Sequence, residues 1–208
     1  MPNAVILLPF LAATLALNFT PGADMAYVVA RSLGQGRAAG IVSALAITAG
    51  SIVHIGLACL GLATLLAHSP LAFRVVQYAG ACYLLFIAWR LWRSGGGNEQ
   101  RAILHASGKR IFVQGVITNV LNPKVALFIL AFLPQFVDPT RGSTVMQMLI
   151  LGALFCLSTT IVNVGVALVT ARAGRAVAGS ARVGRWLTRA SAGILALLAI
   201  RLALGARS

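Results

Sequence analysis

The stretch Asn18-Phe-Thr-Pro-Gly-Ala-Asp-Met-Ala26 interrupts the first long apolar segment of the chain. Proline lacks the amide hydrogen that a helix interior needs, and glycine loosens the backbone. Asp24 adds one of only three carboxylates in the 208 residues. The stretch therefore predicts a helix that is broken at Pro21 and Gly22 and has a charge just beyond the break.

The composition indicates a membrane protein. Hydrophobic residues make up 59% of the chain and charged residues 10%, whereas soluble domains have about 45–50% and about 25%. A membrane span needs about 20 apolar residues. Six runs of this kind follow one another, at roughly 4–30, 38–67, 70–92, 111–137, 143–171 and 186–204. We therefore expect an all-α membrane protein with six transmembrane helices.

The basic residues predict the orientation in the membrane. Twelve of the 17 lysines and arginines lie after the first, third and fifth runs. The positive-inside rule makes these connections cytoplasmic and places both termini outside. The arginines flank spans, so the net charge of +14 indicates contact with a lipid bilayer and no nucleic-acid partner.

The chain has no pattern of an enzyme or a metalloprotein. His54, His68 and His105 lack the spacing of metal ligands. The chain contains neither the phosphate-binding pattern G-x-x-x-x-G-K-[ST] nor the nucleophile pattern G-x-S-x-G. We expect no cofactor, no metal and no catalytic residue.

The second half repeats the first in outline. Asn18-Phe-Thr-Pro21 in the first run is matched by Asn119-Val-Leu-Asn-Pro-Lys124 in the fourth, about half the chain later. Each half holds three spans, and an odd number makes the halves insert in opposite orientations. Interrupted spans at matching positions of such halves indicate the binding site of a transporter.

These features predict one transmembrane transporter domain over residues 1–208. It consists of two inverted three-helix repeats in which helices 1 and 4 are broken. The first repeat covers about 1–93, a cytoplasmic loop about 94–110, and the second repeat about 111–208. Two simple proline kinks are the alternative interpretation.

Each break lies beside an ionisable residue, Asp24 in the first half and Lys124 in the second. Such a group in hydrocarbon costs about 2.5–3.5 kcal/mol even on a lenient scale, and it usually serves an ion or substrate path. A buried ion pair that joins the two halves is the alternative. Counting from the cytoplasmic arginines puts the two residues at different depths, so they need not touch.

Two further sets of polar residues lie inside the runs. His54 follows Ala46 and Gly50 on a face of small residues, where it could relay protons or pack against another helix. A polar island at 158–163 includes Asn163 and could contact substrate or join helices.

In combination these residues resemble the LysE/RhtB family of bacterial amino-acid exporters, over nearly the whole chain. The family commonly has P-G-P where Ala23 follows Pro21 and Gly22 here. The matching motifs are T-P-G at 20–22, A-R-S-L-x-x-G-R-x-A-G at 30–40, Y-A-G-A-C-Y-L-L-F at 78–86, N-P-K at 122–124 and L-P-Q-F-V-D-P at 133–139.

The resemblance implies a secondary transporter that crosses the bacterial cytoplasmic (inner) membrane several times and exports amino acids with the proton gradient. With the site chemistry, it suggests that Asp24 binds the substrate ammonium, while Lys124 and backbone amides at the breaks bind the carboxylate. A single carboxylate favours small neutral amino acids or homoserine-like metabolites. An uncoupled channel, or an exporter of a cation or another small metabolite, is the alternative; a homo-oligomer is compatible with the sequence.

The predicted site residues lie at the two breaks and in the second and fifth runs. Proton coupling is predicted for Asp24 and His54. Substrate binding is predicted for Asn18, Pro21, Gly22, Asp24, Asn119, Asn122, Pro123, Lys124 and Asn163.

Overall fold

The computed structural model describes residues 4–68, 70–93 and 105–178, together with seven residues between 189 and 200. All regular secondary structure in these residues is helical, as the composition predicts. Residues 94–104 of the predicted cytoplasmic loop and most of the predicted sixth span lie outside the described residues.

The first predicted break is present. Helix α1 covers Ala4–Phe19, and α2 begins at Ala23. Pro21 cannot donate a hydrogen bond to the carbonyl four residues earlier, so the helix cannot continue through it. The hydroxyl of Thr20 turns back to donate to the Ala16 carbonyl at 2.7 Å.

Helix α2 covers Ala23–His68 and differs from the prediction at its first third. The sequence analysis places a connection between the first two runs, but the helix continues through Arg31 and Arg37 with a single kink at Gly36. Gly36 has φ 81° and ψ −172°, a conformation that is essentially restricted to glycine. The kink separates a short helical piece, segment 23–35, from the long remainder of α2.

The second predicted break is also present. Helix α4 covers Gly108–Val120, and α5 covers Pro123–Leu127. The Asn122 side chain caps α5 by accepting a hydrogen bond from the Lys124 amide at 3.1 Å. Pro123 occupies the first helical position, where an amide hydrogen is not needed. The helical pieces on the two sides of this break differ in direction by 51°.

Beyond α5 the chain changes its helical winding. A π-helical turn, η1, covers Phe128–Phe132, and a 3-10 turn, η2, covers Leu133–Phe136. The rings of Phe128 and Phe132 lie 4.8 Å apart, and that of Phe132 lies 4.9 Å from Phe136. These rings form the centre of the larger apolar core together with side chains of α1 and of α6, which covers Thr144–Ala178.

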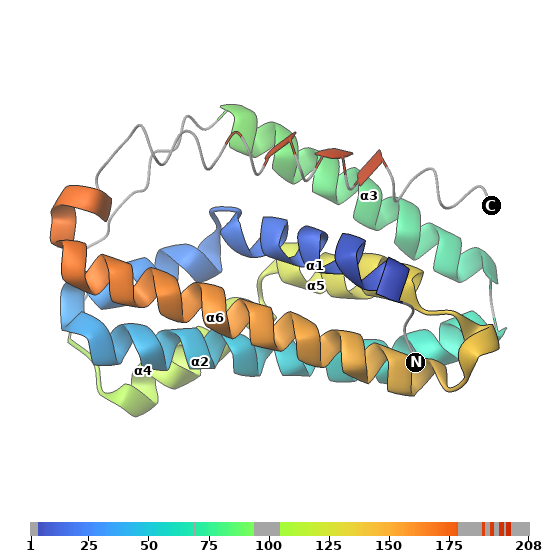
Figure 1. The fold of residues 1–208 in the computed structure, drawn as a ribbon, viewed down its shortest axis with the longest axis horizontal. Helices are drawn as coiled ribbons and strands as arrows, with labels where there is room; N and C mark the ends of the chain where they lie inside the picture. Colours follow the sequence, from blue (N-terminus) through green and yellow to red (C-terminus); the bar gives the residue numbers. More distant parts are fainter. Residues whose placement is uncertain are drawn as a thin grey trace.

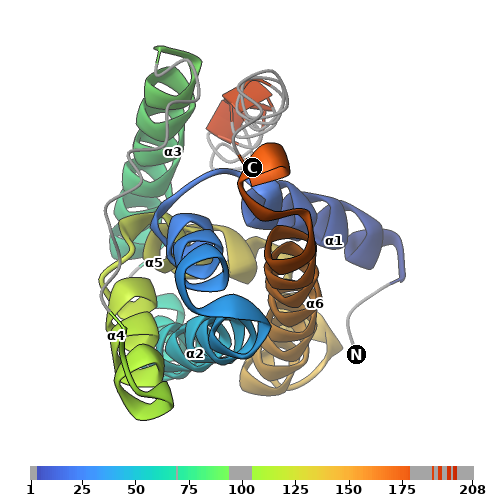
Figure 2. The ribbon, with the colours of Figure 1, turned by 90° about the vertical axis from the view of Figure 1, so that its left-hand side faces the viewer.

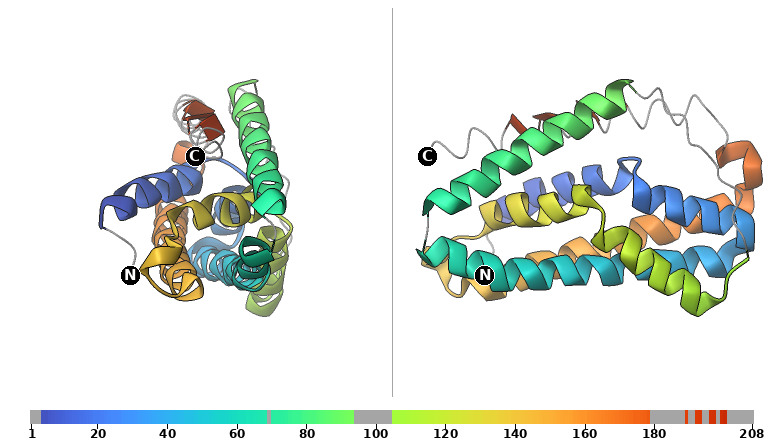
Figure 3. Two further views of the ribbon diagram at one scale, coloured as in Figure 1. Left: turned by 90° about the vertical axis from the view of Figure 1, so that its right-hand side faces the viewer. Right: turned by 180° about the vertical axis from the view of Figure 1, so that it is seen from behind.

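The two longest helices, α2 and α6, run beside each other along the molecule (Figure 1). Helix α4 packs against α2, while α3, Pro70–Arg93, lies at the outside of the bundle (Figure 2). Both breaks fall near the middle of the long axis (Figure 3). The kink of α2, the start of α4 and the last turns of α3 and α6 all lie toward the left of Figure 1, the end that the basic residues predict to be cytoplasmic.

Two helices of the described residues are long and apolar enough to cross a membrane, Ala23–Gly61 and Thr144–Arg172. The bent pair Gly108–Val120 and Pro123–Phe136 makes a third if it is one span. These spans agree with a membrane protein. The arrangement of six spans in two inverted repeats stays a prediction.

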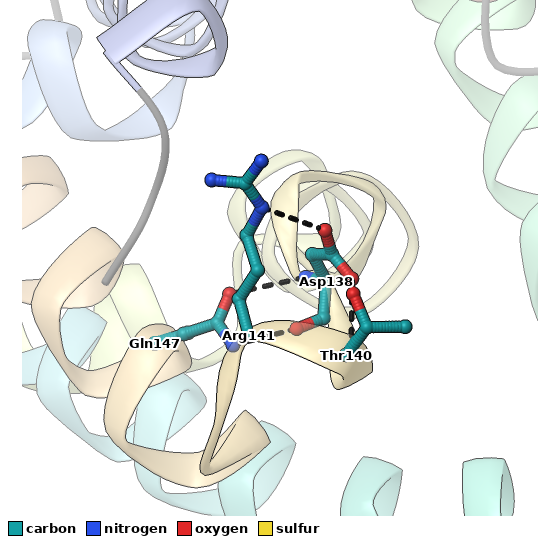
Figure 4. A network of polar contacts seen from close by, with 4 residues as sticks. All are labelled: Asp138, Thr140, Arg141 and Gln147. Carbon is teal, nitrogen blue, oxygen red and sulfur yellow. Dashed lines mark hydrogen bonds and ion pairs between the residues drawn. The ribbon is translucent and has the colours of Figure 1, made fainter.

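A polar network holds the turn before α6 (Figure 4). Asp138 accepts hydrogen bonds from the Thr140 amide at 2.9 Å and hydroxyl at 2.6 Å, and from Arg141 at 3.0 Å. The Gln147 side chain pairs with the backbone of Asp138 through two further bonds. The Thr140 hydrogen bonds, with a smaller effect of Arg141, hold the pKa of Asp138 below its usual value. This carboxylate stabilises the turn.

Candidate functional site

A small cavity lies between the two breaks. The centre of a water molecule can occupy about 10 Å³ of it, which is room for about one water. Leu17, Asn18, Thr20, Asp24, Met25, Lys124, Val125, Phe155, Thr159 and Asn163 line it. An amino acid has several heavy atoms, so the cavity has to widen before it can hold one.

Lys124 reaches from the second break to the first. Its buried Nζ donates hydrogen bonds to the carbonyl oxygens of Leu17 at 3.2 Å and Thr20 at 3.1 Å. In an uninterrupted helix the Leu17 carbonyl would accept from residue 21, but Pro21 has no amide hydrogen. The Leu17 carbonyl accepts instead from the Thr20 amide at 3.1 Å and from the lysine ammonium. Two of the three N–H groups of the ammonium serve α1 in this way, which leaves one for another acceptor.

Asp24 lies in the first turn of α2 and is buried. Its Oδ2 accepts a hydrogen bond from Asn119 Nδ2 at 2.8 Å. Its Oδ1 is also buried and has no hydrogen-bond partner in the described part of the chain. A buried carboxylate oxygen without a donor is costly. An ammonium group brought to this oxygen would therefore gain a strong interaction.

Asp24 and Lys124 both line the cavity, but they form no ion pair within the described residues. Lys124 is bonded to carbonyls of α1, and Asp24 is bonded to Asn119. The alternative of a buried ion pair between the halves therefore does not describe this conformation. The two opposite charges remain separate, and both face the space between the breaks.

Asn119 lies at the end of α4, is fully buried, and contacts α2 on both sides of its kink. Ser51 Oγ donates to Asn119 Oδ1 at 3.3 Å, and His54 Nε2 lies 3.1 Å from the Asn119 carbonyl oxygen. A carbonyl only accepts, so the second contact requires the proton on Nε2. The small-residue face predicted around Gly50 and His54 is thus the surface against which α4 packs.

The polar island of α6 holds α1 as well as lining the cavity. Asn18 accepts a hydrogen bond from Thr159 Oγ1 at 3.0 Å and donates one to Ser158 Oγ at 3.2 Å. Asn163 Nδ2 donates to the Thr159 carbonyl at 3.0 Å. The island thus joins helices, and its contact with substrate stays a prediction.

The structure separates the predicted binding residues into three groups. Those that line the cavity are Asn18, Asp24, Lys124 and Asn163. Those that shape the breaks beside it are Pro21, Gly22 and Asn122; a Cβ on Gly22 would lie 3.2 Å from Lys124 Nζ. Those that lie outside the lining are Asn119, which contacts Asp24, and Pro123, which is exposed.

The sequence analysis missed the apolar wall of the cavity. Leu17, Met25, Val125 and Phe155 form this wall. Nothing distinguishes these residues in the sequence from the many other apolar residues of the same runs. Met25 directly follows Asp24, and Val125 directly follows Lys124. This adjacency to the two charged residues is the one sequence signal that could have indicated two residues of the wall.

A buried polar cavity between two interrupted helices of an apolar bundle is an arrangement typical of membrane transporters. The chain belongs to the LysE type translocator family, whose family model matches residues 15–206. It is therefore a membrane protein of a family of translocators, not of enzymes.

Several curated proteins are similar to the chain. A homoserine/homoserine lactone efflux protein of Salmonella typhimurium is 29% identical over 164 residues, 78% of this chain and 79% of the relative. A leucine efflux protein of Salmonella choleraesuis is 30% identical over 144 residues, 68% of each chain. An uncharacterized membrane protein of Vibrio cholerae is 29% identical over 81% of this chain and 82% of its own length. No solved structure matches the chain.

Proposed function

We propose that the protein exports small neutral amino acids or homoserine-like metabolites from the bacterial cytoplasm by proton-coupled alternating access. It would do so as a single domain of two inverted repeats that crosses the cytoplasmic membrane several times. The family assignment supports export, and the names of two relatives refer to leucine and homoserine efflux. The chemistry of the cavity supports the amino-acid substrate.

The observation that carries this proposal is the buried, unpartnered Oδ1 of Asp24. A zwitterionic amino acid would place its ammonium at this oxygen and remove the cost of the missing hydrogen bond. Because Oδ2 is already held by Asn119, the carboxylate keeps its orientation while Oδ1 receives the ligand.

The substrate carboxylate would bind to the remaining N–H of Lys124. Backbone amides in the first turn of α2 would add to this interaction, because the first amides of a helix have no partner within the helix. The α2 amides follow the first break, and the Lys124 ammonium lies at the same break because it is bonded to the Leu17 and Thr20 carbonyls. The two ends of a zwitterion would thus contact opposite charges in one cavity.

The cavity lining favours a neutral substrate side chain. Its apolar wall includes Phe155 and Val125, both of which are buried. Asp24 is the one carboxylate among the lining residues, and it would be used by the α-ammonium. A lysine side chain would bring a second positive charge with no counter-ion, so lysine should be a poor substrate.

Proton coupling would result from alternate binding of a proton and a substrate at Asp24. Facing outward, Asp24 would take up a proton as the ammonium leaves. Facing inward, it would release the proton and bind the next ammonium. His54 would act on Asp24 only through Asn119, whose carbonyl it contacts.

The test is radiolabelled flux in proteoliposomes with and without an imposed pH gradient, using leucine, homoserine and lysine. We expect gradient-driven accumulation of leucine or homoserine and little of lysine. Asp24→Asn should lose the uphill accumulation while retaining weakened exchange across equal concentrations. Asp138→Asn is the matched control, because it neutralises a carboxylate in a surface turn outside the cavity.

Two results would contradict the proposal. Downhill flux without accumulation in the wild-type protein would indicate a channel. Normal accumulation by Asp24→Asn would exclude Asp24 as the coupling residue, and His54 would be tested next.

A further inference from the structure

Segment 23–35 is bounded by a backbone break at each end. The non-helical stretch at 20–22 precedes it, and the kink at Gly36 follows it. A helical piece between two such points can move as a rigid body, because a few residues at its ends absorb the change in backbone angles. It includes Asp24 and Met25 of the cavity lining.

One face of this segment holds four polar side chains between the cavity and the kink. They recur at intervals of three or four residues, so they lie along one side of the helix. They are Asp24, Tyr27, Arg31 and Gln35. Each is hydrogen-bonded to α4 or to the residues just before it.

The contacts of Tyr27 and Gln35 are made to backbone carbonyls. Tyr27 donates its hydroxyl hydrogen to the Ile111 carbonyl at 2.7 Å. Gln35 Nε2 donates to the Ala106 carbonyl at 2.9 Å, close to the start of α4. These two bonds fix the segment against α4 at the middle and at the end farthest from the cavity.

Arg31 is the centre of this network. The residue is 7% exposed. Nη2 donates to Gln114 Oε1 at 2.7 Å, Nη1 donates to Gln35 Oε1 at 2.6 Å, and the guanidinium lies 5.5 Å from the centre of the Tyr27 ring. The arginine thus joins the other two residues of the segment to a side chain of α4.

We infer that segment 23–35 is the gate between the cavity and the arginine-rich end of the molecule, and that the Arg31–Gln114 bond is the central contact of its lock. The inference rests on the proposed transport function. In this conformation the lock is closed, and opening requires the segment to separate from α4 by rotation about the two breaks. Asp24 is the first contact of the same row, so substrate or proton binding there acts directly on the gate.

The chemistry of the lock suits repeated opening. Gln114 is a neutral partner, and a hydrogen bond from a guanidinium to an amide is weaker than one to a carboxylate. Gln114→Glu should therefore strengthen the lock, whereas Gln114→Leu should weaken it. The two substitutions have opposite expected effects on one contact, which separates a gate from a contact that only stabilises the fold.

The test measures access to the cavity and does not depend on transport. A Met25→Cys reporter is introduced after the native Cys59, Cys82 and Cys156 have been replaced by alanine. Its labelling rate with a charged methanethiosulfonate is measured from each side of the membrane, in inside-out vesicles and in intact cells. Gln135→Leu is the matched control, because Gln135 is also half-buried and hydrogen-bonded but lies outside the lock.

From the arginine-rich side we expect Gln114→Leu to raise the labelling rate about tenfold, which corresponds to about 1.4 kcal/mol. Gln114→Glu should lower the rate, and Gln135→Leu should leave it unchanged. Gly36→Ala should also change the rate, since its backbone conformation is strained for alanine although no atom lies within 4 Å of the new Cβ.

Equal rates for Gln114→Leu, Gln114→Glu and the unsubstituted reporter would overturn the inference. A change of the same sign for both Gln114 variants would also overturn it, because a gate predicts opposite signs. If Gln114→Leu fails to insert, Gln114→Glu and Gly36→Ala still decide the question. These outcomes hold whichever substrate is transported, so a failure of the gate is distinguishable from a failure of the amino-acid proposal.

Discussion

A Cβ atom on Gly50 would lie 2.7 Å from both Cβ and Oδ1 of Asn119. The absence of a side chain at Gly50 is therefore what allows α4 to approach α2 at the level of the second break. Asn119 in turn holds Asp24. The position of the cavity carboxylate thus depends on a glycine in the part of α2 that follows the Gly36 kink.

Gly50→Ala should displace Asn119 and weaken its bond to Asp24. Overpacking of this kind costs about 1–3 kcal/mol, so we expect a lower thermal midpoint in detergent together with reduced export. Gly56→Ala is the control in the same helix, because no atom lies within 4 Å of the added Cβ. If both variants had the thermal midpoint and the export rate of the wild-type protein, the close approach of Gly50 and Asn119 would not hold Asp24 in place.

Lys124→Met should affect substrate binding and stability together. The loss of a charge-assisted contact to the carboxylate should raise the substrate concentration for half-maximal transport about tenfold, or about 1.4 kcal/mol. It also leaves the Thr20 carbonyl without its lysine donor and the Leu17 carbonyl with only the Thr20 amide, which lowers the thermal midpoint. Lys109→Met, at the exposed start of α4, serves as control. A lower thermal midpoint with an unchanged substrate concentration for half-maximal transport would show that Lys124 stabilises the end of α1 and does not bind substrate.

The predicted orientation can be tested by labelling single cysteines in intact cells. A cysteine at Ser143 should react with an impermeant thiol reagent, whereas one at Lys109 should be protected until the membrane is opened. Both positions are exposed: Ser143 lies in the turn before α6, and Lys109 in the first turn of α4. Gly142 is a poorer site because its φ of 109° is unfavourable for cysteine. Labelling at Lys109 alone would reverse the orientation.

The turn at Asp138 should lose part of its contribution to stability in acid. Because the Thr140 hydrogen bonds lower the pKa of Asp138 in the folded protein, the unfolded protein binds a proton more readily. The stabilisation is therefore complete above the usual pKa of 3.8 and is lost as the pH falls through the lower, folded value. The thermal midpoint of the wild-type protein should approach that of Asp138→Asn as the pH falls below 3.8. A constant difference between them would contradict this expectation.

The two breaks could be predicted from the sequence because their causes are local. Pro21 removes a donor from its own helix, and the Asn122 and Pro123 pair starts a new helix wherever it falls. The Gly36 kink was not predicted, since Arg31 and Arg37 indicated a connection between two separate helices at this place.

The contacts of the candidate site could be predicted only in part. Asp24 and Lys124 stand out because ionisable residues are rare in apolar runs. The partners of these two residues do not stand out in the sequence. The Lys124 ammonium, for example, is bonded to backbone carbonyls, which every residue has. Counting residues from the arginines placed the two charges at different depths, but the lysine side chain and the breaks bring both to one cavity.

The size of the cavity affects how binding measurements on this protein will have to be interpreted. Space for about one water means that ligand occupancy requires a second, wider conformation. The apparent dissociation constant is then the intrinsic one divided by the fraction of molecules that are already wide. A weak apparent affinity would be compatible with a close chemical match, and a variant that only enlarges the wide population would bind more tightly without a new contact.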